Sequence, residues 1–152
     1  DAYRPLAGVS VSLSDEGTLC IDAPAVCAKR LVTNDLAEIL PDGRFRVLGR
    51  RDNVVCSGGI KLSIEEMEGK LASLGLRFQL TAVPDERLGE AVTLLYEAEA
   101  EQTAALEEAC RRLLDRYEVP RHYFRVDTLP QTETGKPARA AARQLALRKW
   151  KE

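Results

Sequence analysis

The chain has 152 residues, enough for one sizeable core or for one small domain and a piece of another. Its 45% hydrophobic and 30% charged content is that of an ordinary globular protein, and 22 basic against 24 acidic residues give a formal charge of -2. This balance gives no sign of a general nucleic-acid binder, and no apolar run reaches the roughly 18 to 20 residues that cross a bilayer. We therefore expect no nucleic-acid partner, no membrane span and a cytoplasmic location.

The first fifty residues have the pattern of antiparallel strands. Four short strands are expected, at residues 8–13, 18–21, 36–40 and 44–48. The last two flank Pro41-Asp42-Gly43, whose Asp-Gly step favours a hairpin. The sequence offers no long helix to cover these strands, so residues 1–50 are interpreted as the terminal β portion of a larger domain.

The remaining residues alternate between strand and helix patterns. Ser63 and Glu66 fit a capping box, so a helix is expected to begin there and to stop near Gly75. Its periodicity places Met67 in the core, and a second amphipathic helix, at about residues 105–117, places Tyr117 there too. A terminal helix is expected at residues 136–150, and strands at 78–83, 91–97 and 122–126. The predicted fold class is α+β, a β-hairpin remnant followed by a small domain with a short sheet and about three helices.

Cysteine and histidine give no metal-site pattern. The four cysteines lie mostly in apolar runs without ligand spacing and are interpreted as buried free thiols: Cys20, Cys27, Cys56 and Cys110. His122 is the only histidine, which rules out a site with several histidine ligands. We expect no metal ligands in this chain.

A turn-rich segment near the end, Pro130–Arg139, presents Lys136 before the terminal helix. Pro130 and Gly135 interrupt regular structure, and the ammonium is left as a mobile point charge suited to a phosphate or carboxylate oxygen. A Walker phosphate loop is excluded, because that motif needs a glycine where Pro130 stands. On this segment alone, an exposed lysine in a helix-start turn is the open alternative.

Three further segments accompany the lysine loop in order: Thr33-Asn34-Asp35, Gly49-Arg50-Arg51-Asp52 and Ser57-Gly58-Gly59-Ile60-Lys61. With the segments at 83–90 and 117–120, the pattern from about Thr33 to Arg139 resembles the adenylate-forming superfamily of acyl-CoA synthetases, peptide-synthetase adenylation domains and luciferases. Within it, the motifs look most like those of bacterial o-succinylbenzoate:CoA ligases of menaquinone synthesis.

The resemblance implies a role for individual residues. Asp35 and Arg50 would bind the ribose of ATP, and Lys136 would be the catalytic lysine of adenylation. Asp52 would be the hinge of a mobile C-terminal domain at residues 51–152. The loop against which coenzyme A (CoA) lies would contain Gly58 and Gly59.

The resemblance also implies substrates and a partner. ATP, CoA and a small carboxylic acid are the implied substrates, and Mg²⁺ is expected in the parent enzyme. The motifs that hold adenine, magnesium and the acyl group lie outside this sequence. The implied partner is therefore the missing N-terminal domain of the same protein, and the isolated chain is expected to be inactive.

Two alternatives stay open. The first is an adenylation domain that loads a carrier protein. The second is a non-catalytic docking module that uses the glycine loop and the basic residues of the last helix: Arg139, Arg143, Arg148 and Lys149. For these charges, a solvated helix face is the simpler interpretation.

Overall fold

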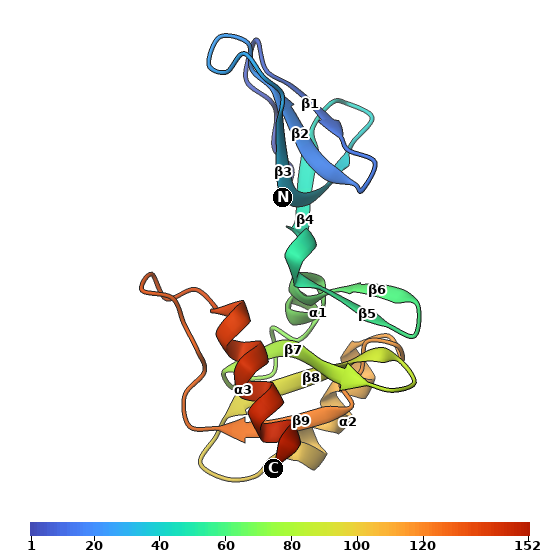
Figure 1. The fold of residues 1–152 in the computed structure, drawn as a ribbon, viewed down its shortest axis with the longest axis vertical. Coiled ribbons are helices and arrows are strands. Elements are labelled where there is room, and N and C mark those ends of the chain that lie inside the picture. The colour runs from blue at the N-terminus through green and yellow to red at the C-terminus, as the bar shows by residue number, and fades with distance from the viewer. The chain divides into compact units, whose positions relative to one another are not determined.

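The computed structural model describes all 152 residues and divides them into two compact units, Asp1–Asn53 and Val54–Glu152 (Figure 1). The division falls three residues after the boundary expected at residue 50. The fold class is α+β as predicted, with three α-helices and two separate sheets. None of the helices combines the length and the apolar content needed to span a bilayer.

Unit 1, residues 1–53, is an antiparallel sheet in the order β1-β2-β3-β4, followed by a 3-10 turn, η1. The bounds are β1 Ser10–Leu13, β2 Thr18–Asp22, β3 Leu31–Ile39, β4 Phe45–Arg50 and η1 Arg51–Asn53. The four predicted strands are confirmed. However, β3 begins five residues earlier than expected, at Leu31 instead of Leu36, so Asp35 lies inside a strand and not in a turn before it.

Unit 1 buries few apolar side chains within itself. Its buried positions are Thr18, Leu19, Cys20 and Ala37. In contrast, Val32 on β3 and Val47 on β4 are 60% and 47% exposed. An antiparallel sheet commonly uses one face for a core and leaves the other to solvent. That unit 1 belongs to a larger domain stays a prediction.

Unit 2, residues 54–152, has a five-stranded sheet in which β8 has the most neighbours. The strands are β5 Val54–Ser57, β6 Ile60–Ser63, β7 Phe78–Asp85, β8 Gly89–Glu97 and β9 His122–Val126. Hydrogen-bonded strands follow the order β6-β5-β8-β7, and β9 pairs in parallel with β8, whereas all other pairs are antiparallel. The helices are α1 Ile64–Lys70, α2 Thr103–Leu113 and α3 Arg139–Lys151.

Alternating residues of β8 supply a core on each face of this sheet. Leu94 and its neighbours two residues away pack with α1 and α2, whereas Leu95 packs with Ala142 and Ala146 of α3. This alternation follows from the two-residue period of a strand. Figure 1 shows α3 lying across one face of the sheet. Met67 of α1 is fully buried, as predicted.

The start of α1 is confirmed and its end is not. The Ser63 hydroxyl accepts a hydrogen bond from the backbone N–H of Glu66 at 3.3 Å, as a capping residue should. The helix ends at Lys70, well before Gly75. The N–H of Leu71 bonds to the carbonyls of both Met67 and Glu68, which tightens the last turn and closes the helix there.

The other two helices also correct the sequence prediction. The chain leaves α2 after Leu113 and is extended at Leu114, so Tyr117 lies beyond the helix. Tyr117 is 54% exposed, and its prediction as a core residue is wrong. Helix α3 begins at Arg139 and not at residue 136, because Pro137 instead pairs with Gln131 in an isolated β-bridge.

The four cysteines are all free, but only two of them are buried. Cys20 and Cys110 pack in the cores of units 1 and 2. Cys27 and Cys56 are exposed, so the prediction of buried thiols is wrong for them. Cys27 lies in the irregular connection between β2 and β3, and Cys56 points outward from β5, whose neighbour Val55 points into the core.

Candidate active-site elements

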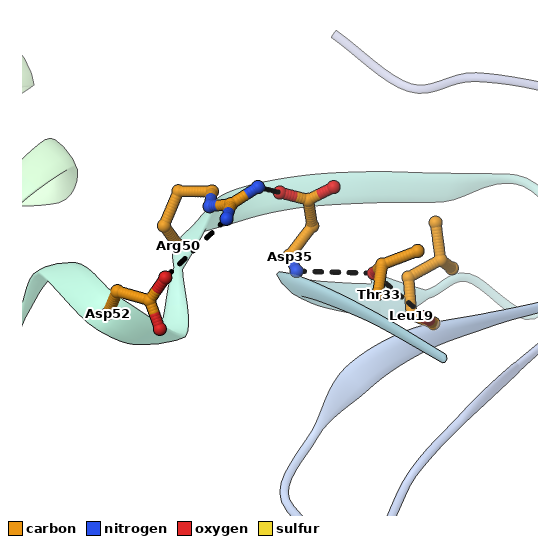
Figure 2. A network of polar contacts seen from close by, with 5 residues as sticks. All are labelled: Leu19, Thr33, Asp35, Arg50 and Asp52. Carbon is orange, nitrogen blue, oxygen red and sulfur yellow. Dashed lines mark hydrogen bonds and ion pairs between the residues drawn. The ribbon is translucent and has the colours of Figure 1, made fainter. Parts of the chain in front are cut away.

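In unit 1, the register of β3 and β4 and the turn η1 that follows bring three of the predicted site residues together (Figure 2). Asp35 lies directly opposite Arg50 in the strand pair. One guanidinium nitrogen of Arg50 lies 3.3 Å from an Asp35 carboxylate oxygen, and another lies 3.5 Å from an oxygen of Asp52. All three side chains are substantially exposed. The predicted ribose-binding pair and the predicted hinge residue are therefore contiguous.

Thr33 fixes the backbone next to Asp35. Its hydroxyl donates to the carbonyl of Leu19 on β2 at 2.8 Å and accepts the N–H of Asp35 at 3.2 Å (Figure 2). The carboxylate of Asp35 has two acceptor oxygens, and the Arg50 guanidinium has a fork of donors. Such a pair can take a vicinal diol, because the diol hydroxyls can both donate and accept.

Asp52 lies in η1, one residue before the last residue of unit 1. Its side chain is 58% exposed and pairs with Arg50 of the same unit. An exposed side chain in a short turn leaves its backbone dihedrals little constrained by packing. A hinge at Asp52 stays a prediction.

In unit 2, the predicted glycine loop is the turn of the β5–β6 hairpin. Gly58 and Gly59 have φ of +59° and +82°, a left-handed pair that a two-residue hairpin of this kind requires. A Cβ on Gly58 would lie 3.4 Å from the Leu88 side chain, whereas a Cβ on Gly59 would meet nothing within 4 Å. The outer side of this turn is thus open, and a ligand can lie against its backbone.

The loop at residues 85–88 supports the glycine turn. The N–H of Gly58 donates to the Leu88 carbonyl at 2.9 Å. The carboxylate of Asp85 accepts the N–H groups of Leu88 and Arg87, both at 2.8 Å, and these hydrogen bonds lower the pKa of Asp85. Asp85 therefore holds its turn as an ionised group at neutral pH.

A cavity of about 1000 Å³ borders the glycine turn and was missed by the sequence analysis. Ser57 and Gly58 line one part of it, and Arg111, Arg116 and Arg121 line other parts. The arginines come from three different places along the chain, namely α2, the segment after it and the residue before β9. Only folding brings them together. Arg111 is paired with Glu107, which also lines the cavity, so Arg116 and Arg121 are the cations left to attract an anion there. Guanidinium groups suit phosphate oxygens.

Aromatic side chains complete this cavity. Tyr117, His122 and Phe124 line it, and the guanidinium of Arg116 lies 4.7 Å from the centre of the Tyr117 ring. Tyr123 also lines the cavity, but its hydroxyl is buried, and this burial raises the pKa of Tyr123 well above the ordinary value. It is therefore neutral at physiological pH. The position of Tyr117 at the cavity explains why it lies outside the core.

Lys136 stands near the end of an exposed hairpin that precedes α3. The N–H of Thr132 donates to the Lys136 carbonyl at 2.7 Å, and the N–H of Gly135 donates to the Thr132 carbonyl at 3.0 Å. Gly135 has a φ of +80°, which explains the glycine at that position. The side chain of Lys136 makes no ion pair within the chain, so its ammonium is available to an external anion.

The basic residues of α3 do not form a continuous free surface. Arg139 pairs with Glu68 at 2.6 Å, and Arg143 pairs with Glu90 at 2.7 Å. Burial lowers the pKa of Arg139, but the hydrogen bonds and charge of Glu68 outweigh this and raise it above the ordinary value. Two of the four charges considered for docking are therefore engaged within unit 2, which disfavours the docking module.

No group of three or more His, Cys, Asp or Glu side chains lies close enough to hold a metal ion.

Residues 80–136 match the AMP-binding enzyme C-terminal domain family. Over these residues, unit 2 is similar to the AMP-binding C-terminal domain of the adenylate-forming superfamily. The matched segment runs from β7 to Lys136 and includes β8, α2 and β9.

Curated relatives extend the similarity. Probable acyl-activating enzyme 4 of Arabidopsis thaliana is 32% identical over 150 residues, which cover 95% of this chain and 25% of that protein. The 2-succinylbenzoate–CoA ligase of Staphylococcus aureus is 32% identical over 107 residues, which cover 68% of this chain and 22% of that enzyme. Tyrocidine synthase 3 and a cholestenoate–CoA ligase match at comparable identity. The chain spans a quarter or less of the length of these relatives.

A solved structure supports the fold. The acyl-CoA synthetase (AMP-forming)/AMP-acid ligase II-like protein of Dyadobacter fermentans is 28% identical, with a TM-score of 0.58 over 93% of this chain and 42% of that one.

Proposed function

We propose that the chain is the C-terminal part of an ATP-dependent ligase that joins a carboxylic acid to CoA. The carboxylate first attacks the α-phosphate of ATP, which gives an acyl-adenylate and pyrophosphate. The CoA thiol then attacks the acyl carbon, and AMP leaves. The match of residues 80–136 to an AMP-binding enzyme C-terminal domain, with an exposed Lys136 at its end, carries this assignment.

In the first half-reaction, three residues of this chain act on ATP. Asp35 accepts hydrogen bonds from the ribose hydroxyls, and Arg50 lies beside the same sugar. Lys136 places its ammonium between the substrate carboxylate and the α-phosphate of ATP. These two negatively charged groups must approach each other for the reaction to occur. A preorganised charge of this kind lowers the barrier most when water is excluded, and its loss commonly costs about 100- to 1000-fold in rate.

In the second half-reaction, CoA binds unit 2 at the β5–β6 turn and not at the Lys136 hairpin. Its pantetheine arm lies along the backbone of Gly58 and Gly59, where no Cβ is in the way. The neighbouring cavity, with Arg116 and Arg121, suits the phosphates of the CoA nucleotide. Rotation about Asp52 exchanges Lys136 for the glycine turn between the two steps. One mobile domain thereby serves two reactions.

The favoured acyl substrate is o-succinylbenzoate. The 32% identity to a 2-succinylbenzoate–CoA ligase over 107 residues supports this choice, together with the motif from Gly49 to Lys61. A second candidate is an adenylation domain that loads a carrier protein, because tyrocidine synthase 3 matches at 35% identity over 115 residues. The two differ in the acceptor thiol, which belongs to CoA in one case and to a carrier's phosphopantetheine in the other.

The experiment uses the full-length protein that contains this chain. Pyrophosphate exchange into ATP is measured with o-succinylbenzoate and with a panel of other carboxylic acids, and thioester formation is measured with CoA and with a phosphopantetheinyl carrier. We expect exchange with o-succinylbenzoate and transfer to CoA. Exchange only with another acid would refute o-succinylbenzoate as the substrate. Transfer only to the carrier would favour the adenylation domain that loads a carrier protein. No exchange with any acid would refute the ligase function.

A further inference from the structure

The Lys136 hairpin is ordered by its own hydrogen bonds but is exposed along its whole length. Thr132 supplies most of these bonds, since its N–H, carbonyl and hydroxyl all bond to Gly135 or Lys136. Exposed hydrogen bonds compete with water, and a short isolated hairpin is marginally stable. Nothing within the hairpin fixes its direction relative to the sheet of unit 2. That direction must come from where its two ends are attached.

The first end of the hairpin is attached to β7 through Gln79. The side-chain amide of Gln79 donates to the Pro130 carbonyl at 2.8 Å, and Gln79 is only 4% exposed. The same carbonyl accepts the N–H of Ala138 at 3.1 Å. One buried donor therefore fixes the atom at which both strands of the hairpin meet.

The second end is attached through Arg139, the first residue of α3. Its two guanidinium nitrogens donate to the two carboxylate oxygens of Glu68 on α1, at 2.9 and 2.6 Å. Glu68 also accepts the backbone N–H of Leu80 on β7 at 3.0 Å. A bidentate pair of this geometry fixes orientation as well as distance. The attachment joins α1, β7 and the start of α3.

From these contacts we propose that Glu68 and Gln79 are positioning residues for Lys136. They hold the two ends of the catalytic hairpin on adjacent residues of one strand, Gln79 and Leu80. This inference rests on the proposed role of Lys136 in adenylation. A misplacement of about 1 Å in a reacting group can cost about 100-fold in rate, so a loosened hairpin should reduce adenylation even though Lys136 is still present.

Apolar packing holds α3 independently of these polar contacts. Ala142, Ala146 and Leu129 are buried against the sheet, at 3% exposure or less. Loss of the Glu68 or Gln79 contact should therefore leave α3 docked and release the hairpin alone. A positioning role and a merely structural role thus predict different measurements.

The test compares Glu68→Gln, Gln79→Met and Arg139→Lys in the full-length protein. Arg139→Lys keeps the charge but loses the bidentate fork, so the fold is retained. We expect each change to lower the rate of adenylation about 10- to 100-fold, with thioester formation from supplied acyl-adenylate unchanged. Hydrogen exchange should become faster in the peptide that covers residues 130–138 and stay unchanged in β8. Glu38→Gln, which breaks an exposed pair with Arg46 in unit 1, is the matched control and should change neither quantity.

The Lys136→Ala variant in the same assay distinguishes the positioning role of Glu68 and Gln79 from the role of Lys136 itself. If Lys136→Ala loses adenylation while the three anchor variants (Glu68→Gln, Gln79→Met and Arg139→Lys) keep adenylation, the positioning role is wrong and the proposed function stands. If Lys136→Ala keeps adenylation, the role of Lys136 is wrong as well. Equal loss of both half-reactions in all three anchor variants, or faster exchange throughout β8, would show a structural role and overturn the proposal.

Discussion

Asp35 and Arg50 are brought together by the register of their strands and not by their own attraction. Their closest atoms lie 3.3 Å apart on an exposed surface, where an ion pair contributes only about 0 to 1 kcal/mol. A ligand that replaces this contact therefore loses little. We propose that this cross-strand pair, held in place by the sheet, binds a sugar through the acceptors of Asp35 and the donors of Arg50.

The Asp35→Asn variant of the full-length protein tests this role. The amide keeps the shape of the carboxylate but loses its charge and one acceptor, so the KM for ATP should rise about 10- to 100-fold. Asp42→Asn is the control, because Asp42 is an exposed aspartate paired with Arg44 in the β3–β4 turn. Steady-state kinetics at varied ATP gives the answer. An unchanged KM in Asp35→Asn would rule out the assignment.

Residue types and motif order predicted the candidate residues on short segments, and the structure places Lys136 on an exposed hairpin as its turn-forming neighbours indicated. Contacts between distant segments could not be predicted in this way. Glu68 and Arg139 are 71 residues apart, and nothing in either local pattern marks them as a pair. The exposure of Tyr117 was missed because helical periodicity was extended past the end of α2.

The β5–β6 hairpin shows how an element sets the shape of a site. Two successive glycines with positive φ make a tight turn whose outer side carries no Cβ. The turn is tied at Gly58 to the 85–88 loop, and the large cavity lies next to it. The sequence patterns predicted seven of the nine strands but missed β5 and β6, and they placed the start of β3 five residues too late. The cavity could not be predicted, because its lining comes from segments that meet only in the folded sheet.

Gly59→Ala in the full-length protein tests the glycine turn. An alanine at φ +82° costs about 1 to 2 kcal/mol, and its Cβ would occupy the open side of the turn. Thioester formation from supplied acyl-adenylate should fall by about 10-fold or more, while pyrophosphate exchange is unchanged. Gly17→Ala is the matched control, with φ +81° and equally open space in the β1–β2 turn of unit 1. Loss of pyrophosphate exchange in Gly59→Ala would contradict the assignment.

The two units of the chain differ in how many side chains they bury. Unit 2 has buried cores on both faces of its sheet, whereas unit 1 buries only a few side chains and exposes apolar ones. The family relation of unit 2 could be predicted from motif order. The proposal of o-succinylbenzoate as substrate rests on motif resemblance and on one relative, since no residue of this chain is assigned to an acyl-binding pocket.

Nucleotide binding should therefore require more than these 152 residues. The chain supplies two candidate ribose contacts and one lysine, and no group of three or more His, Cys, Asp or Glu side chains in it lies close enough to hold a metal ion. Calorimetry of the isolated chain with ATP should show no binding tighter than about 1 mM, which corresponds to about 4 kcal/mol. The full-length protein is the positive control. Tight ATP binding by the isolated chain would mean that it contains a complete nucleotide site.

Measuring both half-reactions in the Lys136→Ala variant tests the proposed role of Lys136 most directly. In the full-length protein, pyrophosphate exchange should fall about 100- to 1000-fold, because the proposed role of the Lys136 ammonium is to stabilise the adenylation transition state. Thioester formation from supplied acyl-adenylate should keep its normal rate, and Lys151→Ala, an exposed lysine in the last turn of α3, should change neither rate. An equal loss of both half-reactions, or no loss of pyrophosphate exchange, would contradict the role of Lys136.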